Sequence, residues 1–187
     1  MDAFLEELKS RQSITDVMLR YVRAIDRMDE ALLRSVFHPG SIHNHFFSGL
    51  SSDPSVPSSI DAPGDFVAFA LGLLRSYSRT HHQLGPTLIE FHGVDKASAE
   101  TYFTAYHRMR PSGDPLAAPN PYDNEMDFFV GGRYLDRLEQ RGGEWKIVER
   151  VGMTDWTKMT PTVAQGFGDI DPTTVGQRAP DDRICHW

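Results

Sequence analysis

Two adjacent histidines, His81 and His82, stand in the segment RTHHQLGP, between an apolar helix-like run and a strand-like run. Histidine is the side chain whose ordinary pKa lies nearest to neutral pH, so it is the commonest general base in enzymes. Successive residues of a strand point to opposite faces, and therefore only one of the two rings can readily face a pocket. Alternation alone does not say which ring that is.

A carboxylate that could orient such a histidine is Asp26, at the end of a helical pattern over residues 13–26. Ile25 and Val22, one and four residues before it, are apolar, so Asp26 lies at the edge of the buried face. A solvent-facing or capping acid is the ordinary role of such a residue. At the rim of a cavity, however, the carboxylate would fix the tautomer of an imidazole and stabilise its cation.

The chain holds eight histidines in 187 residues. His43 and His45 alternate with their neighbours and share one face of a short predicted strand. Such a pair can bind zinc, but no HExxH motif and no cysteine–histidine cluster supplies the further ligands. We therefore expect no metal and no cofactor. His107 closes another strand-like run, ETYFTAYH.

Arg150 follows the strand-like run EWKIVE, which a glycine-rich turn joins to the preceding strand. A three-residue loop, Arg141–Gly143, would pair residue 134 with residue 150 and place Tyr134 and Arg150 on one face. Arg133 would then lie on the other face, and a two-residue turn would reverse that assignment. A buried arginine needs an anionic partner. That partner would be a ligand oxygen, a developing anion, or an internal carboxylate such as Asp26.

The elements that must position these residues follow from periodicity, with helices early in the chain and strands later. Helices are predicted over residues 13–26, 30–37 (with Asp29 as its cap) and 65–77. Strands are predicted over residues 41–50, 86–92, 97–110, 126–140 and 144–153. This order predicts the α+β class, with helices on one face of a curved antiparallel sheet. Loops are predicted over residues 51–64 and 111–125, the second being a turn or a lid.

The composition is that of an ordinary globular chain, with 40% hydrophobic and 24% charged residues. A net charge of −7 argues against nucleic acid or an anionic membrane as the main partner. No apolar run approaches a membrane span, and the acidic amphipathic N-terminal segment is unlike a signal peptide. A single cysteine, Cys185, excludes an internal disulfide. We expect a cytoplasmic protein with one domain.

Several stretches resemble the SnoaL-like domain of the nuclear transport factor 2-like superfamily. They are RYVRAIDRMDEALLRSVFHPGS, THHQLGP, ETYFTAYHR, GGRYLDRLEQRGGEWKIVER and the Asp155-Trp156 pair that follows. The resemblance implies a cone-shaped α+β barrel whose curved sheet and N-terminal helices enclose one deep pocket. This domain would span residues 1–157, and residues 158–187 would form a C-terminal tail that wraps the domain or a neighbouring subunit.

The resemblance also implies roles for particular residues. The branch with scytalone dehydratase, bile-acid 7α-dehydratase and lindane dehydrochlorinase uses a histidine–aspartate pair, which His82 and Asp26 match, while His81 points away. Further active-site positions of these enzymes fall on Arg150, His107, His45 and Tyr21. The chain departs from the family pattern at two turns, where Pro86 replaces the usual asparagine and Gly40 replaces the usual acidic residue.

These matches predict a cofactor-independent lyase, in which Asp26 orients His82 and His82 removes a proton from a carbon or a hydroxyl. Arg150 would stabilise the anion that develops, and His45, His107 or Tyr21 would donate a proton to a leaving hydroxyl. The substrate would be a small apolar molecule of aromatic, steroid or polyketide type. Its expected binding residues are Val22, His43, Phe69, Leu73, Phe103 and Tyr134.

Elimination of water or HX is the leading reaction that we expect. Carbon–carbon cleavage that releases formaldehyde from a lignin-derived diaryl alcohol, in aromatic compound catabolism, is a second possibility. An isomerase or cyclase that shifts a proton between carbons and a non-catalytic ligand-binding or scaffold domain are the alternatives. The resemblance further implies a homodimer or a homotrimer.

Overall fold

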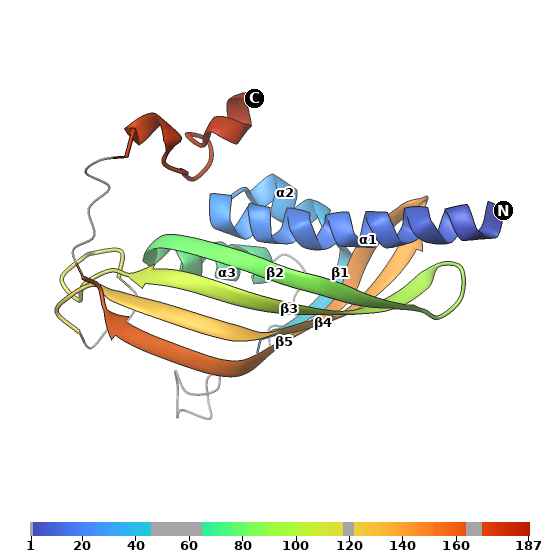
Figure 1. The fold of residues 1–187 in the computed structure, drawn as a ribbon, viewed down its shortest axis with the longest axis horizontal. Coiled ribbons are helices and arrows are strands. Elements are labelled where there is room, and N and C mark those ends of the chain that lie inside the picture. Colours follow the sequence, from blue (N-terminus) through green and yellow to red (C-terminus); the bar gives the residue numbers. More distant parts are fainter. Residues whose placement is uncertain (1, 46–64, 118–121, 164–169) are drawn as a thin grey trace.

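The structure is a computed structural model that describes residues 2–45, 65–117, 122–163 and 170–187. The helices of this part are α1 (Asp2–Arg27), α2 (Glu30–Ser35) and α3 (Asp65–Arg75). Its strands are β1 (Phe37–His45), β2 (Tyr77–Phe91), β3 (Lys96–Met109), β4 (Met126–Arg141) and β5 (Glu144–Pro161). The helices lie on one side of a curved sheet (Figure 1), and the predicted α+β class is confirmed.

The sheet has the strand order β1-β5-β4-β3-β2. Strands β2 to β5 form an antiparallel series, whereas β1 pairs with β5 in the parallel direction. The helix α1 packs one apolar face on this sheet, with Ile14, Val17, Met18 and Tyr21 all buried. Their spacing of three and four residues places them on a single helix face, as an amphipathic helix requires. The core therefore lies between α1 and the concave side of the sheet.

The predicted helix starts are correct for α2 and too late for α1. Asp29 caps α2, because its side-chain oxygen accepts a hydrogen bond of 2.9 Å from the main-chain N–H of Leu32. The helix α1 begins eleven residues before the predicted segment. Its first turns expose Phe4, Leu5 and Leu8. The part of the predicted 41–50 strand beyond His45 lies outside the described residues, as does the loop predicted over 51–64.

Strand β2 was predicted to begin at Pro86 but begins at Tyr77. The two histidines therefore lie inside the strand, where His81 pairs with Tyr106 and His82 pairs with Ala105 of β3. Pro86 lies where the register between β2 and β3 shifts, between Leu84 and Thr87. A proline has no N–H to give to a ladder, so an irregular position is where a strand can hold one.

The β4–β5 hairpin has a two-residue turn, Gly142-Gly143, rather than the predicted three-residue loop. Both glycines have positive φ angles, of 60° and 85°, which the tight turns of β-hairpins require. An irregularity next to Val148 then shifts the register, so that Tyr134 lies opposite Gly152 and Arg150 lies opposite Asp136. This shift puts Tyr134 and Arg150 on one face after all, although they are not paired residues.

A second irregularity bends the sheet at Gly131 and Gly132, which lie opposite Trp156 and Thr154 and leave Asp155 as the extra residue. A methyl group on Gly132 would come within 2.0 Å of the main-chain oxygen of Met153. One on Gly131 would meet the indole ring of Trp156 at 2.1 Å. Bulges of this kind increase the bend of a strand. The two glycines therefore allow β4 and β5 to curve around the helices.

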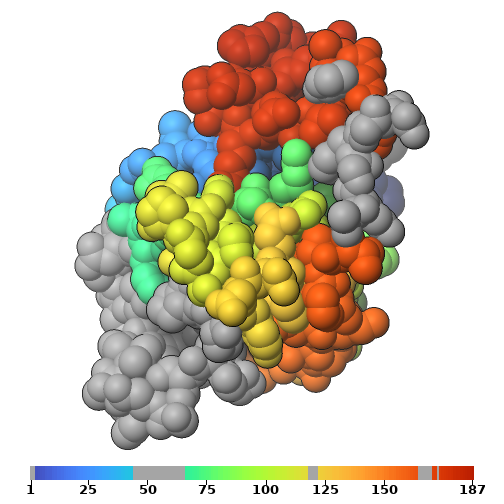
Figure 2. Space-filling model, turned by 90° about the vertical axis from the view of Figure 1, so that its left-hand side faces the viewer, coloured from blue at the N-terminus to red at the C-terminus, as the bar shows by residue number. Residues whose placement is uncertain are grey.

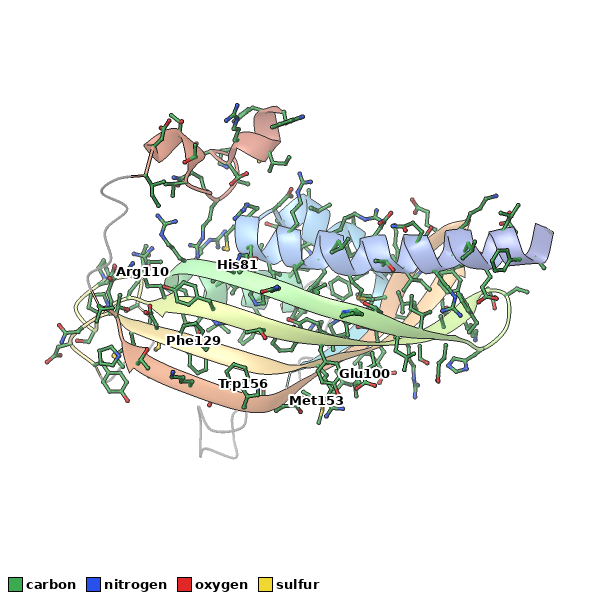
Figure 3. The ribbon with its side chains drawn as sticks, in the orientation of Figure 1. His81, Glu100, Arg110, Phe129, Met153 and Trp156 are labelled. Carbon is green, nitrogen blue, oxygen red and sulfur yellow. The ribbon has the colours of Figure 1, made fainter. Side chains whose placement is uncertain are left out.

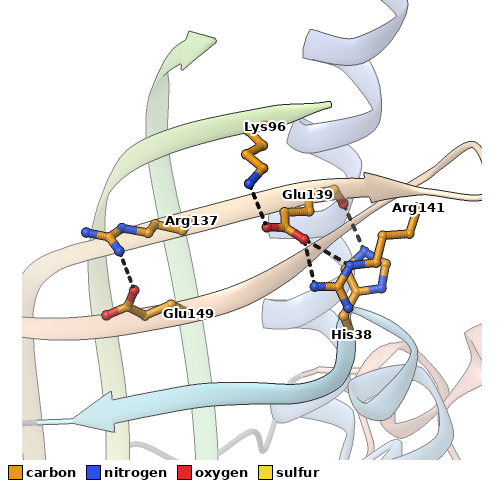
Figure 4. A network of polar contacts seen from close by, with 6 residues as sticks. All are labelled: His38, Lys96, Arg137, Glu139, Arg141 and Glu149. Carbon is orange, nitrogen blue, oxygen red and sulfur yellow. Dashed lines mark hydrogen bonds and ion pairs between the residues drawn. The ribbon is translucent and has the colours of Figure 1, made fainter. Parts of the chain in front are cut away.

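Charged side chains link neighbouring strands near the β4–β5 hairpin (Figure 4). Glu139 of β4 accepts from Arg141 at 2.6 Å and pairs with Lys96 of β3 at 3.7 Å, while His38 Nε2 of β1 lies 2.9 Å from the carbonyl oxygen of Glu139. Arg137 pairs with Glu149 on β5 at 3.1 Å. These ion pairs are largely exposed, so each contributes little to stability.

The C-terminal segment of residues 170–187 lies over the end of α1 and the start of β2 (Figure 2). The main-chain N–H of Ala179 donates to the carbonyl oxygen of Arg27, and the Arg27 side chain pairs with Asp182 at 3.1 Å. Arg178 Nη2 donates to the carbonyl oxygens of Leu74 and Tyr77, at 2.9 Å each. The segment thus contacts its own domain through the ends of α1 and α3. In the described part of the chain, no helix is both long and apolar enough to span a bilayer.

The glycine at the bend gives a prediction of stability. Gly132→Ala should lower the free energy of unfolding by about 2–3 kcal/mol, because its methyl group would collide with the main chain of Met153. Gly72→Ala, on α3, has open space around the new methyl group and should stabilise by up to about 1 kcal/mol. Urea denaturation followed by circular dichroism measures both. Equal effects of the two substitutions would contradict the tight contact at Gly132.

Candidate active site

A cavity of about 80 Å³ lies between α1, α3 and the concave face of the sheet. Its polar side chains are His82, His107, Tyr21, Tyr77, Tyr134 and Thr154. Its apolar wall comes from the helices and from β3, β4 and β5, and includes Ile25, Phe66, Phe69, Leu73, Phe103, Phe128, Val130 and Met153. An apolar cavity with a few converging polar groups is the usual form of a small-molecule site.

Asp26 and His82 are joined by two hydrogen bonds. Asp26 Oδ1 lies 2.7 Å from the ring Nδ1 of His82, and Asp26 Oδ2 accepts the main-chain N–H of His82 at 2.8 Å. Both side chains are nearly buried, with exposed fractions of 10% and 7%. The end of α1 and the middle of β2 thus meet at this pair, and His82 lies on the cavity wall. His81 points to the other face of β2 and is exposed.

The carboxylate of Asp26 fixes which ring nitrogen carries the hydrogen. Burial raises the pKa of Asp26, but the hydrogen bonds and charge of His82 outweigh it, so the pKa lies below its ordinary value. Asp26 is therefore ionised at neutral pH and can only accept hydrogen bonds. Nδ1 of His82 must be the donor, which leaves the lone pair of Nε2 to take up a proton.

His107 lies next to His82, with the ring centroids 5.2 Å apart and the planes at 89°. Burial, and then the charge of His82, lower the pKa of His107 to about 3. The ring is therefore neutral at physiological pH. Its Nδ1 is buried and has no hydrogen-bond partner among the described residues. A neutral ring with an unused nitrogen on the cavity wall is suited to a hydrogen bond with a bound molecule.

Three tyrosines complete the polar part of the cavity wall. Burial raises the pKa of Tyr21, Tyr77 and Tyr134, so all three keep their protons at neutral pH. The ring of Tyr134 stacks on Phe103 at 4.3 Å and meets Tyr21 edge-on at 5.5 Å. The ring centroids of Tyr77 and His107 are 4.8 Å apart. The cavity wall thus carries three protonated tyrosines, of which Tyr77 lies next to His107.

Arg150 lies behind this wall rather than on it. It is completely buried and binds Asp136 through two hydrogen bonds, Nε–Oδ1 at 2.6 Å and Nη2–Oδ2 at 2.8 Å. Its guanidinium lies 4.0 Å from the ring of Tyr21 and 4.4 Å from that of Tyr134. The internal carboxylate that neutralises Arg150 is therefore Asp136, and not Asp26 as the sequence suggested. Arg150 can act on the cavity only through the two tyrosines.

The other predicted binding residues divide into two groups. Phe69, Leu73, Phe103 and Tyr134 line the cavity, as expected. Val22 is instead buried in the core, and His43 is buried against Phe66, with the ring centroids 3.4 Å apart. The His45 side chain lies outside what the structure describes, although its main chain aligns with Gly152 of β5. Within the described residues, no three side chains of metal-ligating type come together.

Several residues that line the cavity were not predicted from the sequence. Phe128 alternates with Val130 and Tyr134 along β4, so its position on the wall could have been read from the pattern. Tyr77 could not, because the helical pattern of residues 65–77 included it. Met153 and Thr154 are consecutive and both line the cavity, which strict alternation does not allow. The bulge beside them explains this departure.

Residues 6–151 match the family model of the SnoaL-like domain. No curated protein matches the chain. A solved structure of the type 2 hexachlorocyclohexane dehydrochlorinase LinA is similar, with a TM-score of 0.66 and 19% identity over 91% of this chain and 99% of that chain. A scytalone dehydratase-like protein from Novosphingobium aromaticivorans has a TM-score of 0.64 and 18% identity, over 86% and 93% of the two chains. At these identities the likeness shows a shared fold, the cone-shaped barrel of nuclear transport factor 2-like proteins.

The neutral state of His107 gives a prediction of acid stability. Burial lowers the pKa of His107 from its ordinary value of 6.5 to about 3 in the folded protein. Between these two pH values the unfolded chain therefore binds one more proton than the folded one. The free energy of unfolding must then decrease as the pH falls through this window, by up to about 1.4 kcal/mol per pH unit. His107→Phe should remove this slope between about pH 6 and pH 4. Asp26, with a pKa below 3.8, acts only under that range.

Urea titrations at a series of pH values measure the two slopes. Parallel curves for the wild type and His107→Phe would show that the ring is charged, or accessible to solvent, in the folded protein.

Proposed function

The chain belongs to the SnoaL-like family, and we propose that it is a lyase that needs no cofactor and uses His82 and Asp26 as its catalytic pair. One observation carries this proposal. Asp26 accepts both the ring N–H and the main-chain N–H of His82, at 2.7 and 2.8 Å, on the wall of an apolar cavity. A histidine held in this way has one tautomer and one direction in which it can accept a proton.

The first step assigned to this pair is removal of a proton by Nε2 of His82. The imidazolium that forms is then balanced by the ionised carboxylate of Asp26. Because both side chains are nearly buried and the wall is largely apolar, this attraction is stronger than it would be in solution. General-base catalysis of this kind contributes about 10²- to 10⁴-fold to a rate.

The second step is departure of a hydroxyl group from the neighbouring carbon. The electron pair of the broken C–H bond forms the double bond, and the hydroxyl leaves as water with a proton from a donor on the cavity wall. Tyr21 is the donor that we favour, because Arg150 opposes the rise in its pKa that burial causes. His107, being neutral, would hydrogen-bond the substrate. Arg150 would thus act through Tyr21 and not directly on a departing anion.

The cavity wall supports an apolar, ring-containing substrate. Four phenylalanines contribute to the wall, together with Tyr21, Tyr77 and Tyr134. The similar structures are named for a dehydrochlorinase and for scytalone dehydratase, which eliminate HCl and water. Proton donors assist the loss of hydroxide more than that of chloride, which is already a stable anion. The hydroxyl donors of this cavity therefore favour elimination of water.

The same groups also support a second reaction, the release of formaldehyde from a diaryl alcohol. His82 would remove the proton of a primary hydroxyl, and the carbon–carbon bond would break to give formaldehyde. The electron pair of that bond would form a double bond and expel the hydroxyl of the next carbon, which would leave as water with the proton of Tyr21. The observation that favours this candidate is the pairing of a base with several hydroxyl donors on an aromatic wall.

The catalytic pair is tested by Asp26→Asn and His82→Gln. Each should lower kcat by about 10²- to 10⁴-fold, because the first loses the fixed tautomer and the second loses the base. Asp16→Asn changes an exposed carboxylate of the same helix, which pairs with Gln12, and should leave kcat unchanged. Circular dichroism establishes that the variants are folded.

The substrate is sought by incubating the protein with cyclic and diaryl alcohols and following the products by mass spectrometry. Loss of 18 mass units, the mass of water, identifies a dehydratase, and formaldehyde in the solution identifies the second reaction. A folded Asp26→Asn or His82→Gln variant that retains the wild-type rate would refute the assignment of the pair. A wild-type protein that binds these alcohols but converts none would favour a binding domain.

A further inference from the structure

A second hollow, of about 590 Å³, lies on the opposite side of β2 from the cavity. One wall is the C-terminal segment around Gln177 and Arg178, and the other is formed by residues 78–81 of β2 with Tyr106 and Arg110. His81 on β2 and Arg110 just after β3 are labelled beneath this segment in Figure 3. We call this hollow the basic cleft. It is separate from the active site, because His81 lines the cleft while His82 lines the cavity.

The charge of the basic cleft is opposite to that of the chain. Among the residues that the structure describes, four arginines line it, namely Arg27, Arg79, Arg110 and Arg178, together with one carboxylate, Asp181. The whole protein has a net charge of −7. Two of these arginines also pair with carboxylates, Arg27 with Asp182 at 3.1 Å and Arg110 with Asp114 at 2.9 Å. Arginine side chains are therefore clustered here on an otherwise acidic molecule, and part of their charge is balanced by these carboxylates.

Arg178 is held in place by hydrogen bonds to main-chain carbonyl oxygens. Its Nη2 donates to two main-chain carbonyls, of Leu74 and Tyr77, and these acceptors carry no formal charge. Burial and then the charge of Arg110 lower the pKa of Arg178, as do the charges of Arg75 and Arg79, and the charge of Asp26 opposes this shift only in part. A lowered pKa means that the surroundings disfavour the cation. An anion placed among these guanidinium groups would relieve that repulsion.

We propose that the basic cleft binds a small molecule with a phosphate or carboxylate group, held by Arg79, Arg110 and Arg178. The planar guanidinium group offers parallel N–H donors that match the oxygens of either anion. A concave site closed on one side by the C-terminal segment suits a small ligand better than an extended polymer or a membrane surface. None of these three arginines lines the cavity, so this proposal does not rest on the proposed function.

Calorimetric titration of the full chain with inorganic phosphate and with citrate tests the site. We expect saturable binding of at least one anion. Arg79→Gln and Arg110→Gln should each weaken it about ten-fold, which is about 1.4 kcal/mol, because each removes a charge-assisted hydrogen bond. Arg178→Gln is less suitable, because that side chain also anchors the C-terminal segment. The matched control is Arg137→Gln, an exposed arginine at the far end of the sheet (Figure 4), which should bind as the wild type does.

The outcomes separate the source of the anion from the existence of the site. Binding of phosphate alone points to a phosphorylated ligand, and binding of citrate alone points to a carboxylic acid. No saturable binding of either anion up to about 10 mM, far weaker than most specific sites, would overturn the proposal. So would an equal loss in Arg137→Gln, which would indicate general charge attraction. If a variant fails to fold, ring signals of His81 in the wild type should shift on addition of the anion, and constant signals would overturn the site.

Discussion

The carboxylate of Asp26 is the contact on which the site depends, because it joins the end of α1 to the middle of β2. A carboxylate that is mostly removed from water must have its oxygens hydrogen-bonded. Here both donors belong to one residue, His82, through its ring and its main chain. A shift of α1 along the sheet would break both bonds together. The packing of Ile14, Val17 and Met18 on the sheet therefore also fixes the position of the proposed base.

A second buried charge, that of Arg150 behind the cavity wall, is also paired with a carboxylate. Arg150 and Asp136 are fully buried, and removing either partner alone would leave an uncompensated charge in the core. The pair connects β4 with β5, and Arg150 reaches α1 through Met18 Sδ at 3.0 Å and the ring of Tyr21 at 4.0 Å. Tyr21 thus has a fixed cation on one side and the cavity on the other. Replacing the pair with apolar residues could keep the fold but would remove the charge that acts on Tyr21.

The sequence was sufficient for those features that depend on local pattern and on family motifs. Alternation and the match to THHQLGP distinguished His82 from His81, and the match of Asp26 supplied the carboxylate that the structure places beside His82. The features that the sequence did not predict depend on the pairing register of the strands. The turn of Gly142 and Gly143 and the bulge at Val148 together put Asp136, which no motif marked, opposite Arg150. The start of β2 was likewise hidden, because only Ser76 separates α3 from β2 and the predicted helical segment of residues 65–77 included Tyr77.

Strand β2 lies between two different chemical environments. His82 faces an apolar cavity, and His81, its neighbour in sequence, faces a cleft with four arginines. The two environments still interact electrostatically. The charge of Asp26 partly opposes the lowering of the pKa of Arg178. An electrostatic interaction is mutual, so the cation of Arg178 must favour the ionised form of Asp26 to the same extent. The C-terminal segment thus carries a cation close enough to interact with the carboxylate that His82 needs, although that segment contributes no side chain to the cavity wall.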